Sequence, residues 1–310
     1  MTLTAWAVTT GEAGMRTQAR GLAAAVADVV VEKVVGDRLA WPWAGRSAAG
    51  VLAPPWPDIM ITCGRRAAPH AIAVKRASGG KTLIVHVQDP RARRGAFDLI
   101  VAMDHDRIDA GGNVIKVPTA LHDLTAENLA AAGRDWRDRF AYLVRPLIGV
   151  AIGGDIRGRP FSSEDGERLV AGLLRLRTVA GLAITPSRRT PAALRQSLDD
   201  EFLGDPAVFL WDLEGDNPYR AILALSDRLV VTGDSVSMMS EAVSTPLPVE
   251  VMDLGIARYA PFIEGLIDAG RVSRFGEVPT PAPTATPINA TEIAAKAVRA
   301  LFQSRTGVVG

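Results

Sequence analysis

The sequence is poor in cysteine and has no surplus of charge. Its only cysteine, Cys63, has no second thiol to pair with, so a disulfide framework is excluded and a reducing compartment fits. The 35 Lys and Arg residues balance the 34 Asp and Glu residues and leave a formal net charge of +1. Binding to nucleic acid by phosphate neutralisation needs a basic surplus, so nucleic acid is not an expected partner.

Long apolar runs are also missing. None approaches the roughly 20 residues that span a bilayer, and no basic segment followed by an apolar one opens the chain as a signal peptide would. We therefore expect a soluble, cytoplasmic protein. Hydrophobic residues make up 48% of the 310 residues and charged residues 22%, as in globular proteins, and a chain of this length is expected to form two domains.

Short apolar runs alternate with helical segments along most of the chain. Strands are expected at residues 5–9, 29–35, 59–62, 82–87, 97–102 and 113–117, and again at 147–152, 181–185, 208–211, 229–231 and 247–251. Segments with helical spacing lie between them, for example at residues 15–27, 67–77 and 124–140. Strands and helices in this alternation form βαβ units and parallel sheets. We therefore predict an α/β protein with two Rossmann-like, doubly wound domains.

The two domains are expected at residues 1–145 and 146–278. Residues 279–287 have the sequence PTPAPTATP, which is typical of a semi-rigid linker. A helix capped near Asn289 or Thr291 follows and runs to about Phe302. Residues 279–310 are therefore predicted to be a linker and a helix that packs back on the N-terminal domain.

Polar residues gather at four strand ends in the second half. Open α/β sheets bind ligands at the carboxyl ends of their strands, and glycine N–H groups, hydroxyls and arginines are what a diphosphate requires. Taken singly, each loop is better explained as a turn or a helix cap, but their joint placement favours a phosphate or nucleotide site. The predicted binding residues there are Gly153, Gly154, Asp155, Ser187, Arg188, Arg189, Thr190, Asn217, Tyr219, Asp234, Ser235, Ser237, Met238 and Glu241.

The loop after the strand at 229–231 is the most informative of the four. Ser235 is placed to cap a helix, whose free N–H groups and positive dipole end suit a phosphate. Glu241 follows in the second turn, near enough to the loop to accept hydrogen bonds from a ribose diol. The alternative is a capped helix with a solvated glutamate.

The first half offers candidates for catalysis on position alone. Glu12, Asp89, Asp104 and His105 all follow predicted strands. Residues 104–106, Asp-His-Asp, do not predict a metal site, because adjacent side chains alternate in direction and no second ligand pair is present. A Ser-His-Asp hydrolase is disfavoured, since the chain lacks a G-x-S-x-G motif.

Eight ordered segments resemble one known family. They include WAVTTGEAGMRTQARGLA, FDLIVAMDHD, IGGDIRGRPFSSED and VVTGDSVSMMSEA, and together they extend from Trp6 to about Phe275. The chain resembles bacterial relatives of the plant elongated-mitochondria fission factor. The plant member is associated with recruiting a dynamin-like GTPase to the outer mitochondrial membrane. One functional hypothesis for the chain is a non-catalytic adaptor that keeps its fold and works through protein or membrane partners.

The second half is also similar, more distantly, to the donor domain of GT-B glycosyltransferases such as the enzyme that makes peptidoglycan lipid II. That likeness implies two Rossmann-like domains facing a cleft, a nucleoside diphosphate sugar as substrate, and neither cofactor nor metal. Glu241 would hold the ribose, Ser235, Ser237 and Gly154 the diphosphate, and Arg188 would offset leaving-group charge. Gly14 would face the donor phosphates or the acceptor.

The function expected first is therefore transfer of a sugar from a nucleoside diphosphate to a cell-envelope or lipid-linked acceptor. Such an acceptor implies peripheral association with the inner membrane. The adaptor hypothesis is the alternative.

Overall fold

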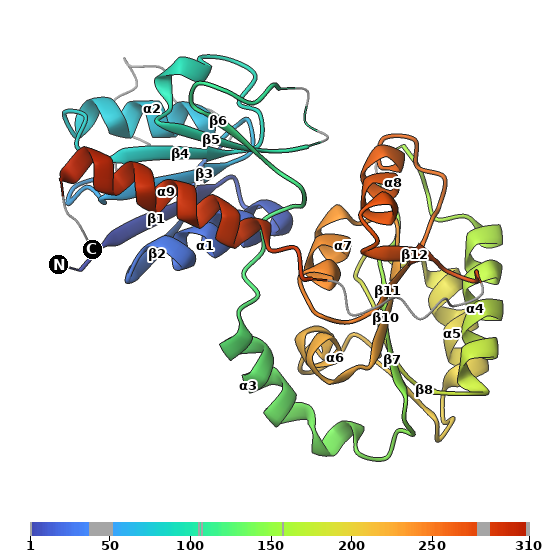
Figure 1. The fold of residues 1–310 in the computed structure, drawn as a ribbon. Helices are drawn as coiled ribbons and strands as arrows, with labels where there is room; N and C mark the ends of the chain where they lie inside the picture. Colours follow the sequence, from blue (N-terminus) through green and yellow to red (C-terminus); the bar gives the residue numbers. More distant parts are fainter. Residues whose placement is uncertain are drawn as a thin grey trace. The chain divides into compact units, whose positions relative to one another are not determined.

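The computed structural model describes residues 2–36, 52–104, 106, 108–156, 158–277 and 286–307. The chain forms two compact units (Figure 1). Unit 1 contains Met1–Asp123 together with Asn289–Gly310, and unit 2 contains Leu124–Ile288. Each unit is built on a parallel sheet of six strands, so the predicted α/β class with two Rossmann-like units is confirmed.

The sheet of unit 1 has the order β2-β1-β3-β4-β5-β6. Its strands are β1 (Thr4–Thr9), β2 (Val29–Val34), β3 (Ile59–Cys63), β4 (Leu83–Val87), β5 (Leu99–Met103) and β6 (Val114–Val117). The three strands β3, β4 and β5 are buried along their whole length and rich in aliphatic residues, as central parallel strands require. Helices α1 (Ala13–Val26) and α9 (Ala290–Thr306) lie on one face, and α2 (Ala68–Ala77) lies on the other (Figure 1).

The C-terminal helix α9 belongs to unit 1, as the sequence predicts. Its cap is Asn289, whose side chain accepts the N–H of Glu292 at 3.1 Å. The hydroxyl of Thr291 accepts the N–H of His122 and donates to its carbonyl, both at 2.8 Å. Val298 is fully buried in the helix layer beside α1. Most of the predicted linker lies outside the described residues.

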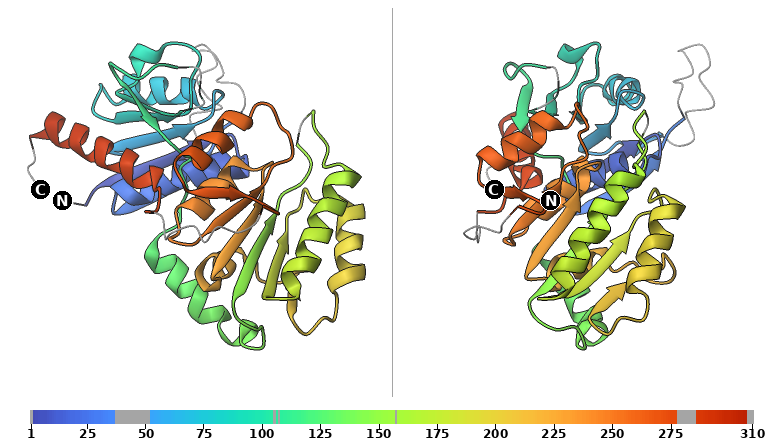
Figure 2. Two further views of the ribbon diagram at one scale, coloured as in Figure 1. Left: turned by 45° about the vertical axis from the view of Figure 1, so that its right-hand side comes forward. Right: turned by 90° about the vertical axis from the view of Figure 1, so that its right-hand side faces the viewer.

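The sheet of unit 2 has the order β12-β11-β10-β7-β8-β9. Its strands are β7 (Leu147–Ile152), β8 (Gly181–Pro186), β9 (Val208–Leu210), β10 (Arg228–Thr232), β11 (Val249–Met252) and β12 (Val272–Arg274). Helices α4 (Ser163–Arg177) and α5 (Ala192–Phe202) cover one face (Figure 2). The other face is covered by α3 (Ala126–Trp136), α6 (Tyr219–Leu225), α7 (Val236–Val243) and α8 (Ala260–Asp268).

Unit 2 begins before α3, whereas the sequence places the boundary at residues 145 and 146. The reason is aromatic packing at the end of α3. Trp136 meets Phe209 edge-on, with ring centroids 5.8 Å apart, and Phe140 lies 4.9 Å from the same ring. These buried contacts tie the helix to the core of unit 2.

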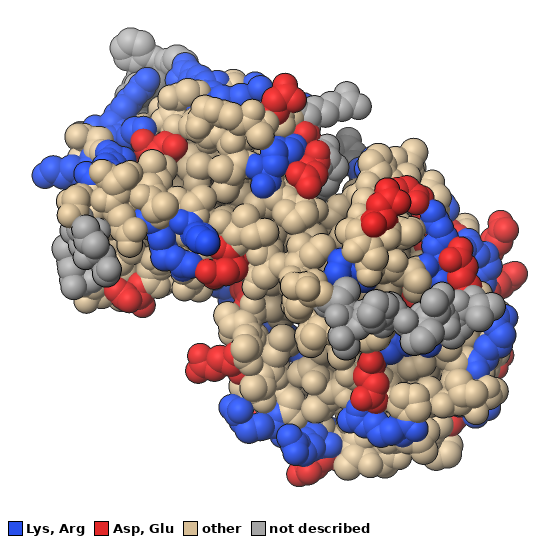
Figure 3. Space-filling model, in the orientation of Figure 1, with Lys and Arg blue, Asp and Glu red and all other residues tan. Residues whose placement is uncertain are grey.

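The charged side chains are mixed in sign. Figure 3 shows Lys and Arg interspersed with Asp and Glu over the visible face of each unit, in keeping with the net charge of +1. In the part of the chain that the structure describes, no helix has the length and apolar character needed to cross a membrane.

Three of the described histidines, His70, His86 and His122, are buried in unit 1. His86 in β4 is fully buried, with Nδ1 2.8 Å from the Thr62 hydroxyl and its ring packed on Phe97. Burial lowers the pKa of His86 to about 3 and that of His122 to about 4. Both imidazoles are therefore neutral at physiological pH.

We expect these histidines to make the protein acid-sensitive. Below about pH 6.5 the unfolded chain binds a proton that folded His86 does not bind until about pH 3, so the free energy of unfolding should fall by about 1.4 kcal/mol per pH unit for this group. Urea unfolding at a series of pH values should show that the free energy of unfolding falls less steeply with decreasing pH in His86→Leu than in the wild type. A wild-type His86 ring resonance that titrates near pH 6.5 in an NMR titration would refute the assignment.

Candidate functional site

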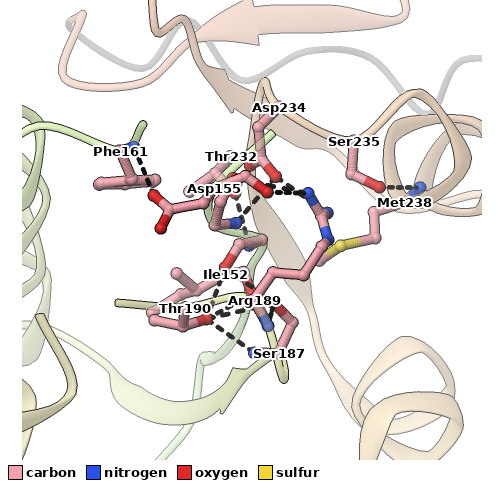
Figure 4. Close-up of polar contacts among 12 residues, drawn as sticks. Ile152, Asp155, Phe161, Ser187, Arg189, Thr190, Thr232, Asp234, Ser235 and Met238 are labelled. Atoms are coloured by element: carbon pink, nitrogen blue, oxygen red, sulfur yellow. Dashed lines mark hydrogen bonds and ion pairs between the residues drawn. The ribbon is translucent and has the colours of Figure 1, made fainter. Parts of the chain in front are cut away.

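Three of the predicted loops meet at the carboxyl edge of the sheet in unit 2. Strands β10, β7 and β8 are neighbours, so the loops that follow them lie side by side (Figure 4). They are residues 153–155 after β7, 187–190 after β8 and 233–235 after β10. The fourth predicted loop, at 217–219, comes after β9 and leads into α6.

The carboxylate of Asp234 holds these loops together. Its side chain is only 1% exposed. One oxygen accepts the N–H of Gly154 at 2.8 Å and the guanidinium of Arg189 at 3.1 Å. The other accepts the Thr232 hydroxyl at 2.7 Å. The carboxylate of Asp234 therefore already binds Gly154 and Arg189, two of the groups that the sequence predicts to bind a phosphate.

Both glycines of the β7 loop are required by this packing. A Cβ on Gly153 would lie 2.0 Å from the carboxylate of Asp234, and a Cβ on Gly154 would lie 2.0 Å from the carbonyl oxygen of Arg189. The N–H of Gly153 donates to the Thr232 hydroxyl at 2.8 Å. Each amide thus has a partner inside the protein, and the glycines allow the close approach of neighbouring loops.

The hydroxyl residues of the β8 loop also bind within the protein. Ser187 and Thr190 both donate to the carbonyl of Gly153, at 2.8 and 2.5 Å. Asp155 accepts the N–H of Phe161 at 2.8 Å. These predicted residues lie together and fix the shape of the loops. Arg188 is exposed and has no ion-pair partner among the described residues.

Helix α7 begins at the same edge. Ser235 caps it by accepting the N–H of Met238 at 3.3 Å, which confirms the predicted cap. The first N–H groups of any helix lack partners within it, so those of Val236 and Ser237 point beyond this end. The four residues 235–238 are partly exposed, and Glu241 lies on the same face as Ser237 and Met238 by helical spacing.

Glu241 is the most unusual acid of the site. Its side chain is buried, and this burial raises the pKa of the carboxyl even though Tyr219 and Arg220 act to lower it. Burial, followed by the charge of Glu241, raises the pKa of the Tyr219 hydroxyl well above its usual range. The N–H of Tyr219 is held by the side chain of Asn217 at 2.9 Å. The structure therefore places Asn217, Tyr219 and Glu241 in one group.

Two residues of this edge are not among the binding residues predicted from the sequence. Thr232 binds both the Gly153 amide and Asp234, and Arg220 acts electrostatically on Glu241. A hydroxyl at the last position of a buried strand was the available signal for Thr232. No local signal marks Arg220, because its partner lies on a different helix.

The catalytic candidates belong to unit 1. A hydrogen bond from Thr10 at 2.6 Å lowers the pKa of Glu12. Burial acts to raise the pKa of Asp89, but the paired guanidinium of Arg94, at 2.9 and 3.1 Å, holds it below its usual range. A general base for neutral pH needs a higher proton affinity than these two carboxylates have.

The remaining predicted residues of unit 1 do not supply a better candidate for a general base. Asp104 is exposed after β5, and Gly14 lies in the first turn of α1. His105 lies outside the described residues. Among the residues that are described, no three His, Cys, Asp or Glu side chains gather in a way that could hold a metal ion.

Comparison with known proteins identifies the family. The family model described as mitochondrial fission ELM1 matches residues 13–302. The chain belongs to the ELM1 family. Mitochondrial fission protein ELM1 of Arabidopsis thaliana is 31% identical to it over 244 residues, which cover 71% of this chain and 57% of the plant protein. The chain thus spans just over half the length of this curated relative.

The fold of this ELM1-family chain is that of GT-B enzymes. A putative UDP-N-acetylglucosamine 2-epimerase from Listeria monocytogenes superposes with a TM-score of 0.65 at 12% identity, over 100% of this chain and 98% of the epimerase. The glycosyltransferase SnogD from Streptomyces nogalater gives a TM-score of 0.53 at 14% identity, over 97% and 95% of the two chains. At such identities the likeness is one of fold, and the predicted GT-B-like class is confirmed.

Proposed function

We propose that this ELM1-family protein binds a nucleoside diphosphate sugar through unit 2 and transfers the sugar to an acceptor hydroxyl. The observation that carries the proposal is the burial of the Glu241 carboxyl on α7. Burying a carboxylate without full compensation costs free energy, and here the raised pKa of Glu241 marks that cost. A ribose diol would donate two hydroxyl hydrogen bonds to this carboxylate and offset the cost.

The diphosphate is assigned to the start of α7. The Gly154 amide and Arg189 already bind Asp234, so the groups left for a phosphate are the first N–H groups of α7, the hydroxyls of Ser235 and Ser237, and Arg188. Helix N-termini favour anions through these N–H groups and the helix dipole. GT-B epimerases and glycosyltransferases of known structure support nucleotide-sugar chemistry as the class.

In the transfer, the bond between the anomeric carbon and the diphosphate breaks while the acceptor oxygen bonds to that carbon. The nucleoside diphosphate leaves with the electron pair, and the acceptor hydroxyl gives its proton to a base. The α7 amides and Arg188 would stabilise the charge that develops on the leaving group. An envelope or lipid-linked acceptor, with peripheral association at the inner membrane, stays a prediction from the resemblance.

A thermal-shift panel of UDP, GDP and CMP, with their sugars, tests the proposal. One nucleotide at 100 times its Kd should stabilise unit 2 by about 2.7 kcal/mol, or roughly 5–10 °C. Arg188→Ala should weaken this binding about tenfold, because one charge-assisted contact is lost. Arg195→Ala removes an exposed arginine of α5 and should leave binding unchanged.

The same panel separates the two candidate functions. Release of free nucleoside diphosphate in the presence of acceptor extracts would establish transfer. Binding without turnover would favour the adaptor, which the environments of Glu12 and Asp89 also favour because neither suits a general base. A flat response to every nucleotide would overturn the proposal.

A further inference from the structure

A groove lies between α4 and α5 in unit 2. Figure 2 shows these two helices side by side on one face of the sheet. The volume of the groove is about 420 Å³. Its floor is apolar and includes Phe161, Val170, Leu174 and Leu194. Val170 and Leu174 are only partly buried, so α4 presents apolar surface that no element of the described chain covers.

The charged residues that line this groove are all acidic. Glu167 lies on the α4 wall, and Asp200 and Glu201 lie on the α5 wall. Each is exposed, and none forms an ion pair among the described residues. The arginines of the two helices lie elsewhere: Arg168, for example, pairs with Asp165. The groove therefore has an apolar floor between two negatively charged walls.

The dimensions and walls of the groove suit a helix. Along α4 the lining extends from Ser163 to Leu174, which at 1.5 Å per residue is roughly 17 Å, or three helical turns. Small residues such as Gly166, Ala171 and Ala193 line it and permit the backbone of a third helix to approach closely. Amphipathic helices bind such grooves through apolar anchors spaced at i, i+3, i+4 and i+7.

We propose that the α4–α5 groove binds a basic amphipathic helix of a protein partner. The apolar face of that helix lies on Val170, Leu174 and Leu194, and its Lys or Arg residues pair with Glu167, Asp200 and Glu201. The acidic walls repel an anionic lipid surface, so charge complementarity selects a cationic protein segment. The groove is a different surface from the nucleotide site, and the proposal does not depend on sugar transfer.

The test uses a synthetic amphipathic peptide of about 15 residues, or four turns, made of Leu, Ala and Lys. A second peptide carries Glu in place of Lys and keeps the Leu spacing. We expect the 310-residue chain to bind the Lys peptide saturably, more tightly at low salt, and not to bind the Glu peptide. In Glu167→Lys/Glu201→Lys the affinity for the Lys peptide should fall about tenfold, and the Glu peptide should now bind.

Matched controls keep the test decisive. Asp199→Lys makes one such charge reversal on α5 outside the groove lining, half the charge change of the double variant, and should bind the Lys peptide like the wild type. Val170→Gln should weaken binding by removing apolar contact while leaving every charge in place. Circular dichroism verifies that the variants are folded, which is expected because the changed positions are at least partly exposed.

Several results would overturn the proposal. These are no saturable binding of the Lys peptide, equal binding of both peptides, or an affinity that the double charge reversal leaves unchanged. A concentration-dependent dimer that Glu167→Lys/Glu201→Lys dissolves would instead assign the groove to a second copy of the chain.

Discussion

Replacing Asp234 with alanine is expected to destabilise unit 2 by about 3 kcal/mol, or roughly 6–12 °C in Tm. The carboxylate is buried and accepts hydrogen bonds from the Gly154 amide, the Thr232 hydroxyl and Arg189. Its removal leaves the buried amide and hydroxyl without an acceptor, and each unmet group costs about 1–3 kcal/mol. Urea unfolding of the purified variant at pH 7 measures the change.

Arg189→Ala is the matched partner of this variant. Its side chain is 44% exposed, so water can solvate the lone Arg189 in Asp234→Ala. In Arg189→Ala the buried carboxylate of Asp234 keeps the hydrogen bonds from Gly154 and Thr232, so this variant should lose less stability than Asp234→Ala. A larger loss of stability in Asp234→Ala than in Arg189→Ala would show that Asp234 holds the loops together and is more than one half of a surface ion pair. If the two variants lose equal stability, the hydrogen bonds to Gly154 and Thr232 contribute little, and Asp234 does not hold the loops together.

The fold was predictable because its signals are local. Buried parallel strands are nearly continuous apolar runs, and helix caps depend on residues within one turn, which is why the caps at Ser235 and Asn289 are confirmed. The start of unit 2 was not predictable in this way. It depends on Trp136 packing against Phe209, and no local pattern links two residues so far apart in the chain.

The position of the candidate-site loops was predictable from the sequence, but the hydrogen bonds between them were not. Strand exits place Gly154, Arg189 and Asp234 at one edge, as expected. The sequence cannot show that Asp234 accepts the Gly154 amide 80 residues away, nor that a Cβ at Gly153 would meet that carboxylate. A glycine loop that cradles a phosphate and one that admits a neighbouring loop have the same composition. Only packing distinguishes them.

Glu241→Gln is expected to weaken nucleotide binding by about 10- to 100-fold and, at the same time, to stabilise the ligand-free protein at pH 7. The loss of binding reflects charge-assisted hydrogen bonds to the ribose, which contribute about 1.5–3 kcal/mol. The gain in stability has a separate cause. Burial raises the pKa of Glu241, so the ionised carboxylate destabilises the folded state, and glutamine removes this charge.

The pH dependence follows from the direction of that shift. Below about pH 4.3 the carboxyl of Glu241 is protonated in both the folded and unfolded chains, so the wild type and Glu241→Gln should be equally stable there. As pH rises through the folded pKa, the wild type alone loses stability, and the difference in Tm should grow to a plateau near neutral pH. Thermal unfolding of both proteins from about pH 4 to 8 measures it.

Glu250→Gln is the control that isolates the role of Glu241. Burial also raises the pKa of Glu250, but this carboxylate pairs with Arg228, so its loss leaves a largely buried cation unpaired and should destabilise the protein. Tyr219 and Arg220 offset the burial of Glu241 only in part, which is what a site awaiting a hydroxyl donor requires. If Glu241→Gln instead lowers stability at pH 7 while nucleotide affinity is unchanged, Glu241 is a structural acid held by Tyr219 and Arg220, and the ribose assignment fails.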